Sequence, residues 1–203
     1  MADITAIFWD IGGVLLTNGW DHAARWRAAE VFGLEWDEFE ARHESLENAF
    51  DKAQLTLDQY LDRVIFHKDR PFSREKLTEF MFAQSLPHHE VISIVADLAL
   101  KARYFLAALN NEPLELNHYR IQRFGLRRYF SAFFSSCFLE LAKPDPAIYR
   151  RALQITQRSP DECLFIDDRP ANLESASLIG IRTLHHQGEP AELRRLLADL
   201  LAG

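Results

Sequence analysis

The sequence predicts an α/β fold, a doubly wound parallel sheet with an inserted all-α cap. Three observations predict it. After residue 88, short apolar runs alternate with amphipathic runs, which is typical of βαβ units. A long helix-rich block separates the first apolar run from this alternating part. Acidic and amide residues follow several apolar runs, where ligands bind in open parallel sheets.

The first strand is predicted at residues 4–9, a short apolar run that ends in an aromatic residue. Residues 21 to about 85 differ, because the pattern there is helical and no convincing strand occurs. Thr56 and Gln59 have the spacing of a capping box, and Ser73 can cap a further helix. This block is therefore predicted to be all helical.

The second half of the chain alternates between strands and helices. The expected strands are RYFLAAL, AFFSSCF, CLFID and IRTLHH, at residues 103–109, 132–138, 163–167 and 181–186. The expected helices lie at 90–102, 113–125, 145–155 and 170–180, followed by a last helix with a leucine stripe. Asp145 and Pro146 begin the third of these helices as a capping residue and a proline at the first helical position.

The helical block interrupts the α/β pattern after its first strand. We therefore expect a discontinuous core domain at residues 1–16 and 88–203 and a helical cap domain at 17–87. Neither an internal repeat nor a low-complexity segment is present in the sequence.

The composition is that of an ordinary globular chain, with 203 residues, 48% hydrophobic and 26% charged. A net charge of −7, without a basic stripe, argues against nucleic acid as a partner. No apolar run reaches membrane-span length, and the N-terminus lacks the basic region of a secretory signal. Cys137 and Cys163 lack metal-binding spacing and are expected to be reduced core thiols. A cytoplasmic protein is predicted, and the oligomeric state is left open.

Polar side chains follow four of the predicted strands. In chain order they are Asp10, Asn110, Asn111, Lys143, Asp167 and Asp168. Three carboxylates in one dry crevice cannot all stay ionised without a cation, and Mg²⁺ prefers carboxylate, water and phosphate oxygens. For Asp168 alone, an aspartate that begins a helix is the alternative explanation.

Two glycines, Gly12 and Gly13, follow Asp10 directly. Glycine leaves the backbone unshielded, so a small charged group can come close to it. A simple turn after a strand is the alternative, and it explains the glycines but not the aspartate.

The segments FWDIGGVLL, LNN, KPDPAIY and FIDDRPANLESASLIG occur in this order. They resemble the four motifs of the haloacid dehalogenase-like hydrolase superfamily, in its subfamily with a C1-type helical cap. The resemblance covers nearly the whole core, about two thirds of the chain, and implies a Rossmann-like core. The sugar-phosphate phosphatases and the phosphatase domain of soluble epoxide hydrolases are the most similar branches.

The resemblance implies that the chain is a Mg²⁺-dependent hydrolase that acts on a small phosphorylated metabolite. Asp10 would be the nucleophile and would form an aspartyl-phosphate. Lys143 would hold Asp10 and the phosphoryl oxygens by its charge. The phosphate would also lie against residues at the ends of the first two strands, which are Gly12, Gly13, Asn110 and Asn111.

The resemblance also implies a metal site. Asp10, Asp168 and the backbone carbonyl of Gly12 would bind Mg²⁺, and Asp167 would orient water beside it. Asn172 would support the loop that carries these acids.

Two positions depart from the family pattern. Most phosphatases of the family have a second aspartate two residues after the nucleophile as general acid and base, where this chain has Gly12. Such a group contributes about 10²–10⁴-fold to the rate, so it must be replaced, tolerated or unneeded. Asp21 and His22 are candidate replacements, although Asp21 also suits a helix N-cap. Asn110 stands where the family has Ser or Thr.

Trp20 follows the first motif where a cap joins the site, so Trp20 and His22 are candidate substrate contacts. Two rival functions remain open. A 2-haloacid dehalogenase also uses the first aspartate but needs no metal, whereas FIDDRP favours phosphate chemistry. A non-catalytic member that binds a phosphorylated ligand or a partner protein is the other rival, because of Gly12 and Asn110.

Overall fold

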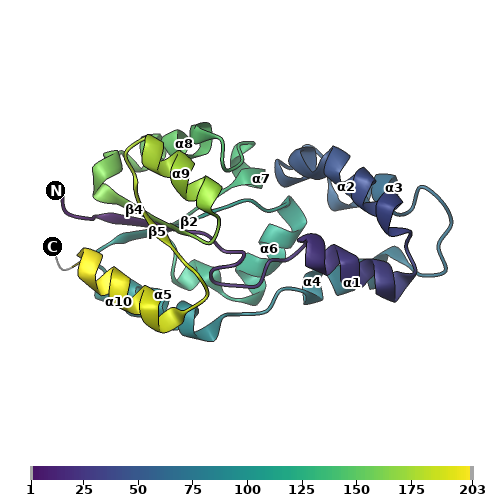
Figure 1. The fold of residues 1–203 in the computed structure, drawn as a ribbon, viewed down its shortest axis with the longest axis horizontal. Helices are drawn as coiled ribbons and strands as arrows, with labels where there is room; N and C mark the ends of the chain where they lie inside the picture. The colour runs from purple at the N-terminus through teal and green to yellow at the C-terminus, as the bar shows by residue number, and fades with distance from the viewer. Residues whose placement is uncertain (1, 202–203) are drawn as a thin grey trace.

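The computed structural model describes residues 2–201 and contains a five-stranded sheet with a separate helical lobe at one end (Figure 1). The strands are β1 Ala6–Trp9, β2 Phe105–Asn110, β3 Ala132–Ser135, β4 Cys163–Asp167 and β5 Arg182–His185. All four pairings are parallel, and the spatial order is β3-β2-β1-β4-β5. This confirms the predicted doubly wound α/β core.

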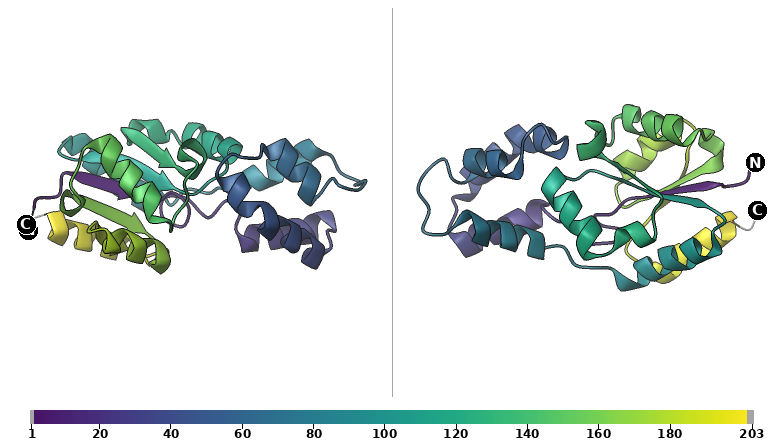
Figure 2. Two further views of the ribbon diagram at one scale, coloured as in Figure 1. Left: turned by 90° about the horizontal axis from the view of Figure 1, so that it is seen from above. Right: turned by 180° about the vertical axis from the view of Figure 1, so that it is seen from behind.

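Helices cover both faces of the sheet, as the two ribbon views of Figure 2 show. Helices α5 His89–Lys101 and α10 Pro190–Leu201 pack on one face, and α8 Pro146–Thr156 and α9 Pro170–Leu178 pack on the other. Strand β1 supplies both cores, because Ile7 and Trp9 face the first pair and Ala6 and Phe8 face the second. Burial on both faces explains why the strands are uninterrupted apolar runs.

The helical lobe has a hydrophobic core of its own. It consists of α1 His22–Phe32, α2 Trp36–Asp51, α3 Leu57–Val64 and α4 Arg74–Ala83. The predicted caps are present: Thr56 and Gln59 form a reciprocal capping box, Ser73 caps α4, and Asp21 caps α1 through the N–H of Ala24. Helix α6 Leu114–Arg123 joins the lobes, because its Leu116 packs in the cap core.

Two linkers connect the lobes and run beside each other. Thr17 N–H donates to Leu86 O at 2.8 Å, and the Thr17 hydroxyl accepts from Leu86 N at 2.9 Å and donates to Gln84 O at 2.7 Å. The change from core to cap packing at these linkers supports the predicted boundaries of 1–16, 17–87 and 88–203, which stay a prediction.

One expected strand is shorter than predicted. Residues 132–138 were predicted to be extended, but β3 ends at Ser135 and Ser136–Leu139 form the short helix α7. The pairing of Ser135 with Asn110 is the last one available, because β2 also ends there. The remaining elements are the 3₁₀ turns Leu126–Arg128 and Pro160–Glu162. Within residues 2–201, none of the helices has the length and apolarity needed to cross a membrane.

Candidate active site

The candidate site lies at the carboxyl edge of the sheet, where β1 and β4 end side by side. Trp9 pairs with Ile166, and the N–H of Asp10 donates to Ile166 O at 2.9 Å. Asp10 and Asp167, the next residues of the two strands, therefore emerge at the same point. Both side chains are buried, with exposed fractions of 9% and 0%.

Lys143 joins these two acids from the loop that precedes α8. Its Nζ lies 2.9 Å from Asp10 Oδ1 and 2.6 Å from Asp167 Oδ2. Burial raises the pKa of Asp10 to about 7, because the Lys143 charge only partly offsets the desolvation and the neighbouring Asp167 charge adds to it. Burial acts to lower the pKa of Lys143, but the two carboxylates outweigh it and raise that pKa. The ammonium is therefore held charged beside the predicted nucleophile.

Asp167 is fixed by the start of α9. Its carboxylate accepts the Arg169 N–H at 2.7 Å, and both oxygens accept from the Asn172 amide at 3.1 Å. The Asn172 carbonyl in turn accepts from the Tyr149 hydroxyl at 2.9 Å. Asn172 is thus bonded on both sides, to Asp167 and to Tyr149, and its role in supporting the acidic loop stays a prediction.

Asp168 completes a group of three carboxylates and explains Gly13. One oxygen from each of Asp10, Asp167 and Asp168 lies within 4.8 Å of the others. Gly13 has a φ of +74°, and a Cβ there would lie 2.2 Å from Asp168 Oδ2, so the carboxylate occupies the space that a side chain would need. Burial, followed by the Asp167 charge, raises the pKa of Asp168.

This donor set fits a hard divalent cation. Asp168 Oδ1 is buried and has no hydrogen-bond partner among residues 2–201, which is costly unless a cation or water meets it. The donors are all carboxylate oxygens, which are the ligands that Mg²⁺ prefers. Asp10 and Asp168 converge, as a shared metal ion would require.

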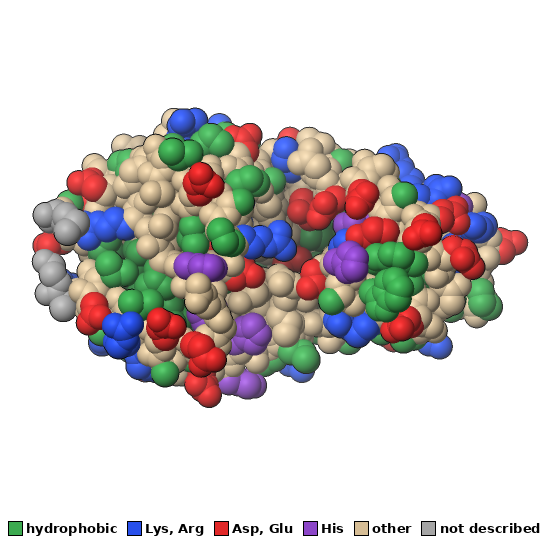
Figure 3. Space-filling view, viewed as in Figure 1, with side chains coloured by type: hydrophobic (Ala, Val, Ile, Leu, Met, Phe, Trp, Pro, Cys, Tyr) green, Lys and Arg blue, Asp and Glu red, His purple; other side chains and the backbone are tan. Residues whose placement is uncertain are grey.

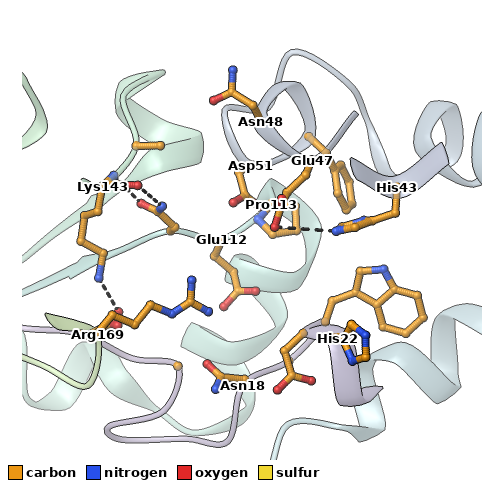
Figure 4. A pocket seen from close by; sticks show the side chains of 18 of the residues that line it. Asn18, His22, His43, Glu47, Asn48, Asp51, Glu112, Pro113, Lys143 and Arg169 are labelled. Atoms are coloured by element: carbon orange, nitrogen blue, oxygen red, sulfur yellow. Dashed lines mark hydrogen bonds and ion pairs between the residues drawn. The ribbon is translucent and has the colours of Figure 1, made fainter. Parts of the chain in front are cut away.

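A cavity of about 490 Å³ opens above Asp10, between the core and the cap (Figures 3 and 4). Acidic side chains gather over the cap helices α2 and α3 beside this hollow. Asp10, Gly12, Asn111, Lys143 and Asn172 line the cavity from the core, and Trp20 and His22 line it from the cap.

The structure places the two predicted asparagine contacts, Asn110 and Asn111, differently from each other. Asn110 is fully buried and does not line the cavity, because its amide bonds to Asn117 at 3.2 Å and to Ser135 Oγ at 2.8 Å. Asn111 does line it, and its amide pairs with the backbone N–H and C=O of Lys143, both at 2.8 Å. Asn111 therefore fixes the Lys143 loop.

The other predicted contacts have structural partners as well. The Gly13 N–H donates to Leu16 O at 2.8 Å. Trp20 is 8% exposed, and its indole N–H donates to the Tyr60 hydroxyl at 2.9 Å within the cap core. The His22 ring is exposed at the cavity rim and packs on Trp36, with 4.9 Å between ring centroids. The phosphate-binding and substrate roles of all these residues stay predictions.

Sequence reasoning missed several lining residues. Glu112 follows Asn111 directly at the end of β2, so its place in the chain could have indicated it. Glu47 and Asp51 are four residues apart on α2 and share one helix face, which is visible in the sequence only once the helix is known to face the core. The sequence does not indicate the positions of Arg120 and Arg169, because they depend on how distant elements meet.

Comparisons with known proteins agree with the fold. A model of the haloacid dehalogenase-like hydrolase family matches residues 4–180. Flavin mononucleotide hydrolase 1 of Arabidopsis thaliana is 29% identical over 161 residues, which cover 79% of this chain and 64% of that protein. This chain therefore spans less than two thirds of that relative's length.

Two further similarities extend over most of both chains. The phosphorylated carbohydrates phosphatase of Thermotoga maritima is 24% identical over 190 residues, which cover 89% of this chain and 83% of that protein. The structure of a HAD family enzyme from Bacteroides thetaiotaomicron, in complex with magnesium and inorganic phosphate, superposes with a TM-score of 0.75 at 19% identity. The match covers 92% of this chain and 96% of that one, and it shows a shared fold.

Proposed function

The chain belongs to the haloacid dehalogenase-like hydrolases, and from this we propose that it hydrolyses phosphate monoesters of small metabolites with Mg²⁺ as its cofactor. The observation that carries the proposal is the convergence of Asp10, Asp167 and Asp168 beside Lys143, with one buried oxygen of Asp168 unpartnered. Relatives named flavin mononucleotide hydrolase and phosphorylated carbohydrates phosphatase support it.

In the proposed reaction Asp10 is the nucleophile. Its carboxylate forms a bond to phosphorus as the ester P–O bond breaks, and water then hydrolyses the aspartyl-phosphate. The ammonium of Lys143, 2.9 Å from Asp10 Oδ1, favours the ionised form of that carboxylate and lies where it can stabilise charge on the phosphoryl oxygens. Asp10, Asp168 and the Gly12 carbonyl would hold Mg²⁺, with Asp167 beside them, and the bound ion would neutralise negative charge between carboxylates and phosphate.

The acidic site also separates this proposal from the two rivals. A dehalogenase that works without metal does not need a third carboxylate. A buried, unpartnered oxygen such as Asp168 Oδ1 would then cost stability without a cation to offset it. A non-catalytic member does not need a nucleophile, whereas here the buried ammonium of Lys143 aligns the carboxylate of Asp10. Gly12 and the burial of Asn110 remain the features that favour the non-catalytic alternative.

The test is a screen of phosphate esters with Mg²⁺, in which acid quenching of the wild-type enzyme should trap phosphate on Asp10. We expect Asp10→Asn to abolish turnover and trapping, and EDTA to abolish turnover reversibly. Asp69→Asn, which alters an exposed carboxyl of the cap, should leave both unchanged. Turnover of 2-halo acids that persists in EDTA would favour the dehalogenase, and phosphate-ester binding without trapping would favour the non-catalytic member.

A further inference from the structure

Because position 12 is a glycine, it supplies no side chain for the proton transfers of the proposed reaction. The space beside Gly12 is filled instead by other side chains: a Cβ built on Gly12 would lie 3.0 Å from Asn18 Oδ1 and 3.5 Å from Arg120 Nη1. The region that a side chain at position 12 would enter is therefore occupied by an amide and a guanidinium.

The guanidinium of Arg120 is fixed by three partners, one of which is the carboxylate of Glu112. Arg120 is fully buried and donates to Ser85 Oγ at 3.0 Å and to Thr17 O at 2.8 Å. Its Nη1 donates to Glu112 Oε2 at 2.5 Å. Arg120 Nη1 lies 3.5 Å from the Cβ point on Gly12 and 2.5 Å from Glu112 Oε2. This oxygen is therefore at most about 6 Å from the Cβ point.

Glu112 lines the cavity and belongs to the same loop region that positions Lys143 beside the nucleophile. It follows Asn111, whose amide fixes the Lys143 loop, and Lys143 in turn contacts Asp10. Figure 4 shows the Glu112 side chain extending toward the guanidinium of Arg169 and the side chain of Asn18. Within residues 2–201, the hydrogen bonds of its carboxylate use only Oε2, so Oε1 is left for a ligand.

We propose that Glu112, positioned by Arg120, exchanges the proton with the leaving group and with water, in place of a side chain at position 12. This inference rests on the proposed phosphatase function. In the first step the Glu112 carboxyl gives its proton to the ester oxygen as the P–O bond breaks and Asp10 bonds to phosphorus. In the second, the Glu112 carboxylate takes a proton from water as the water oxygen bonds to phosphorus and the Asp10–phosphorus bond breaks.

The charges around Glu112 suit a group that changes its protonation state. Burial raises the pKa of Glu112, and Arg120 on α6 opposes this, followed by Lys143 and Arg169 on the adjoining loops. From the cap, the Asp51 carboxyl faces the same cavity, and burial followed by the Glu112 charge raises its pKa to about 8. Glu112 and Asp51 thus adjoin the reaction space in unequal surroundings, and of these two Arg120 fixes only Glu112 in place.

The test compares Glu112→Gln with wild type on two substrates, p-nitrophenyl phosphate and glycerol phosphate. The aryl ester has a good leaving group that departs without a proton, whereas the alkyl ester needs one. We expect Glu112→Gln to lose about 10²–10⁴-fold in kcat on glycerol phosphate. On the aryl ester it should release a burst of p-nitrophenolate equal to the enzyme present and then stall, with phosphate trapped on Asp10.

A purely structural role for Glu112 would give a different pattern, because loss of the Arg120 partner would slow both substrates equally and produce no burst. That outcome, or kcat on glycerol phosphate within threefold of wild type, would overturn the inference. Asp51→Asn is the matched comparison, and a burst with Asp51→Asn instead of Glu112→Gln would move the role to Asp51.

Two further measurements cover folding and the underlying function. Glu112→Asp keeps the charge opposite Arg120 but shortens the side chain by one methylene. This variant should therefore slow turnover of glycerol phosphate more than it slows the p-nitrophenolate burst. If circular dichroism shows that Glu112→Gln does not fold, Glu112→Asp becomes the test. Equal slowing of glycerol phosphate turnover and of the burst would then overturn the inference. A folded wild type that turns over neither ester and traps no phosphate would overturn the proposed function itself.

Discussion

At the scale of single residues, the site depends on where a side chain is missing as much as on where one is present. Gly13 has no side chain, so the Asp168 carboxylate can occupy that space and approach Asp10. The sequence predicted a close approach at these glycines, but by a phosphoryl group. The neighbour at Gly13 is the carboxylate of Asp168, 155 positions later in the chain, and only the folded structure reveals such a partner.

Gly13→Ala should therefore weaken Mg²⁺ binding beyond the strain it introduces. The left-handed φ of +74° costs alanine about 1–2 kcal/mol of stability, and the new Cβ would also displace Asp168. Gly33→Ala is the matched control, because Gly33 has a φ of +62° and nothing within 4 Å of its Cβ point. We expect both variants to lower the free energy of unfolding, Gly13→Ala by more because of the clash with Asp168, and we expect about tenfold or greater weakening of Mg²⁺ affinity by calorimetry for Gly13→Ala alone.

At the scale of elements, the sequence predicted most strands and helices because each carries its own local pattern. Thr56 and Gln59 cap α3, and Asp145 and Pro146 begin α8, by contacts within four residues. The prediction failed where a partner decides the structure: residues 136–138 have strand-like composition, but β2 offers no further pairing after Asn110. The burial of Asn110 escaped prediction for the same reason, since Asn117 and Ser135 take its amide.

The paired linkers predict a specific role for Thr17. Its hydroxyl donates to Gln84 O and accepts from Leu86 N, so one side chain joins the linker that enters the cap to the linker that leaves it. Thr17→Val keeps the shape but removes both hydrogen bonds, and because water can reach these groups the cost should be about 0.5–1.5 kcal/mol in the free energy of unfolding. Hydrogen exchange at the Leu86 amide should also accelerate. Thr17→Ser, which keeps the hydroxyl, should resemble wild type, and equal behaviour of the two variants would contradict this role.

At the scale of the whole molecule, folding gathers negative charge around one cavity. Asp10, Asp167 and Asp168 meet at the sheet edge, and Glu47, Asp51 and Glu112 line the wall above them, in a chain whose net charge is already −7. The sequence predicted the first group, because the carboxyl ends of parallel strands meet at one edge. It could not predict the second, because that group forms only where the cap meets the core.

This concentration of acids predicts how stability depends on pH in the metal-free protein. Burial raises the pKa of Asp10 from 3.8 to about 7 and that of Asp51 from 3.8 to about 8. Between about pH 4 and these values the folded chain holds protons that the unfolded chain has released, so the unfolded state binds fewer protons. The free energy of unfolding in EDTA should therefore fall as pH rises from about 5 to about 8, by at most about 1.4 kcal/mol per pH unit for each group.

Mg²⁺ should oppose this fall, because it binds the ionised carboxylates of the folded chain only. At a concentration of 100 times its dissociation constant, a ligand of the folded state adds about 2.7 kcal/mol, so the curves with Mg²⁺ and with EDTA should separate as pH rises. Denaturant titrations at several pH values measure both curves. Asp168→Asn should follow the EDTA curve whether or not Mg²⁺ is present, whereas Asp69→Asn should respond as wild type does. Equal responses of these two variants to Mg²⁺ would show that the ion stabilises the protein elsewhere than between Asp10 and Asp168.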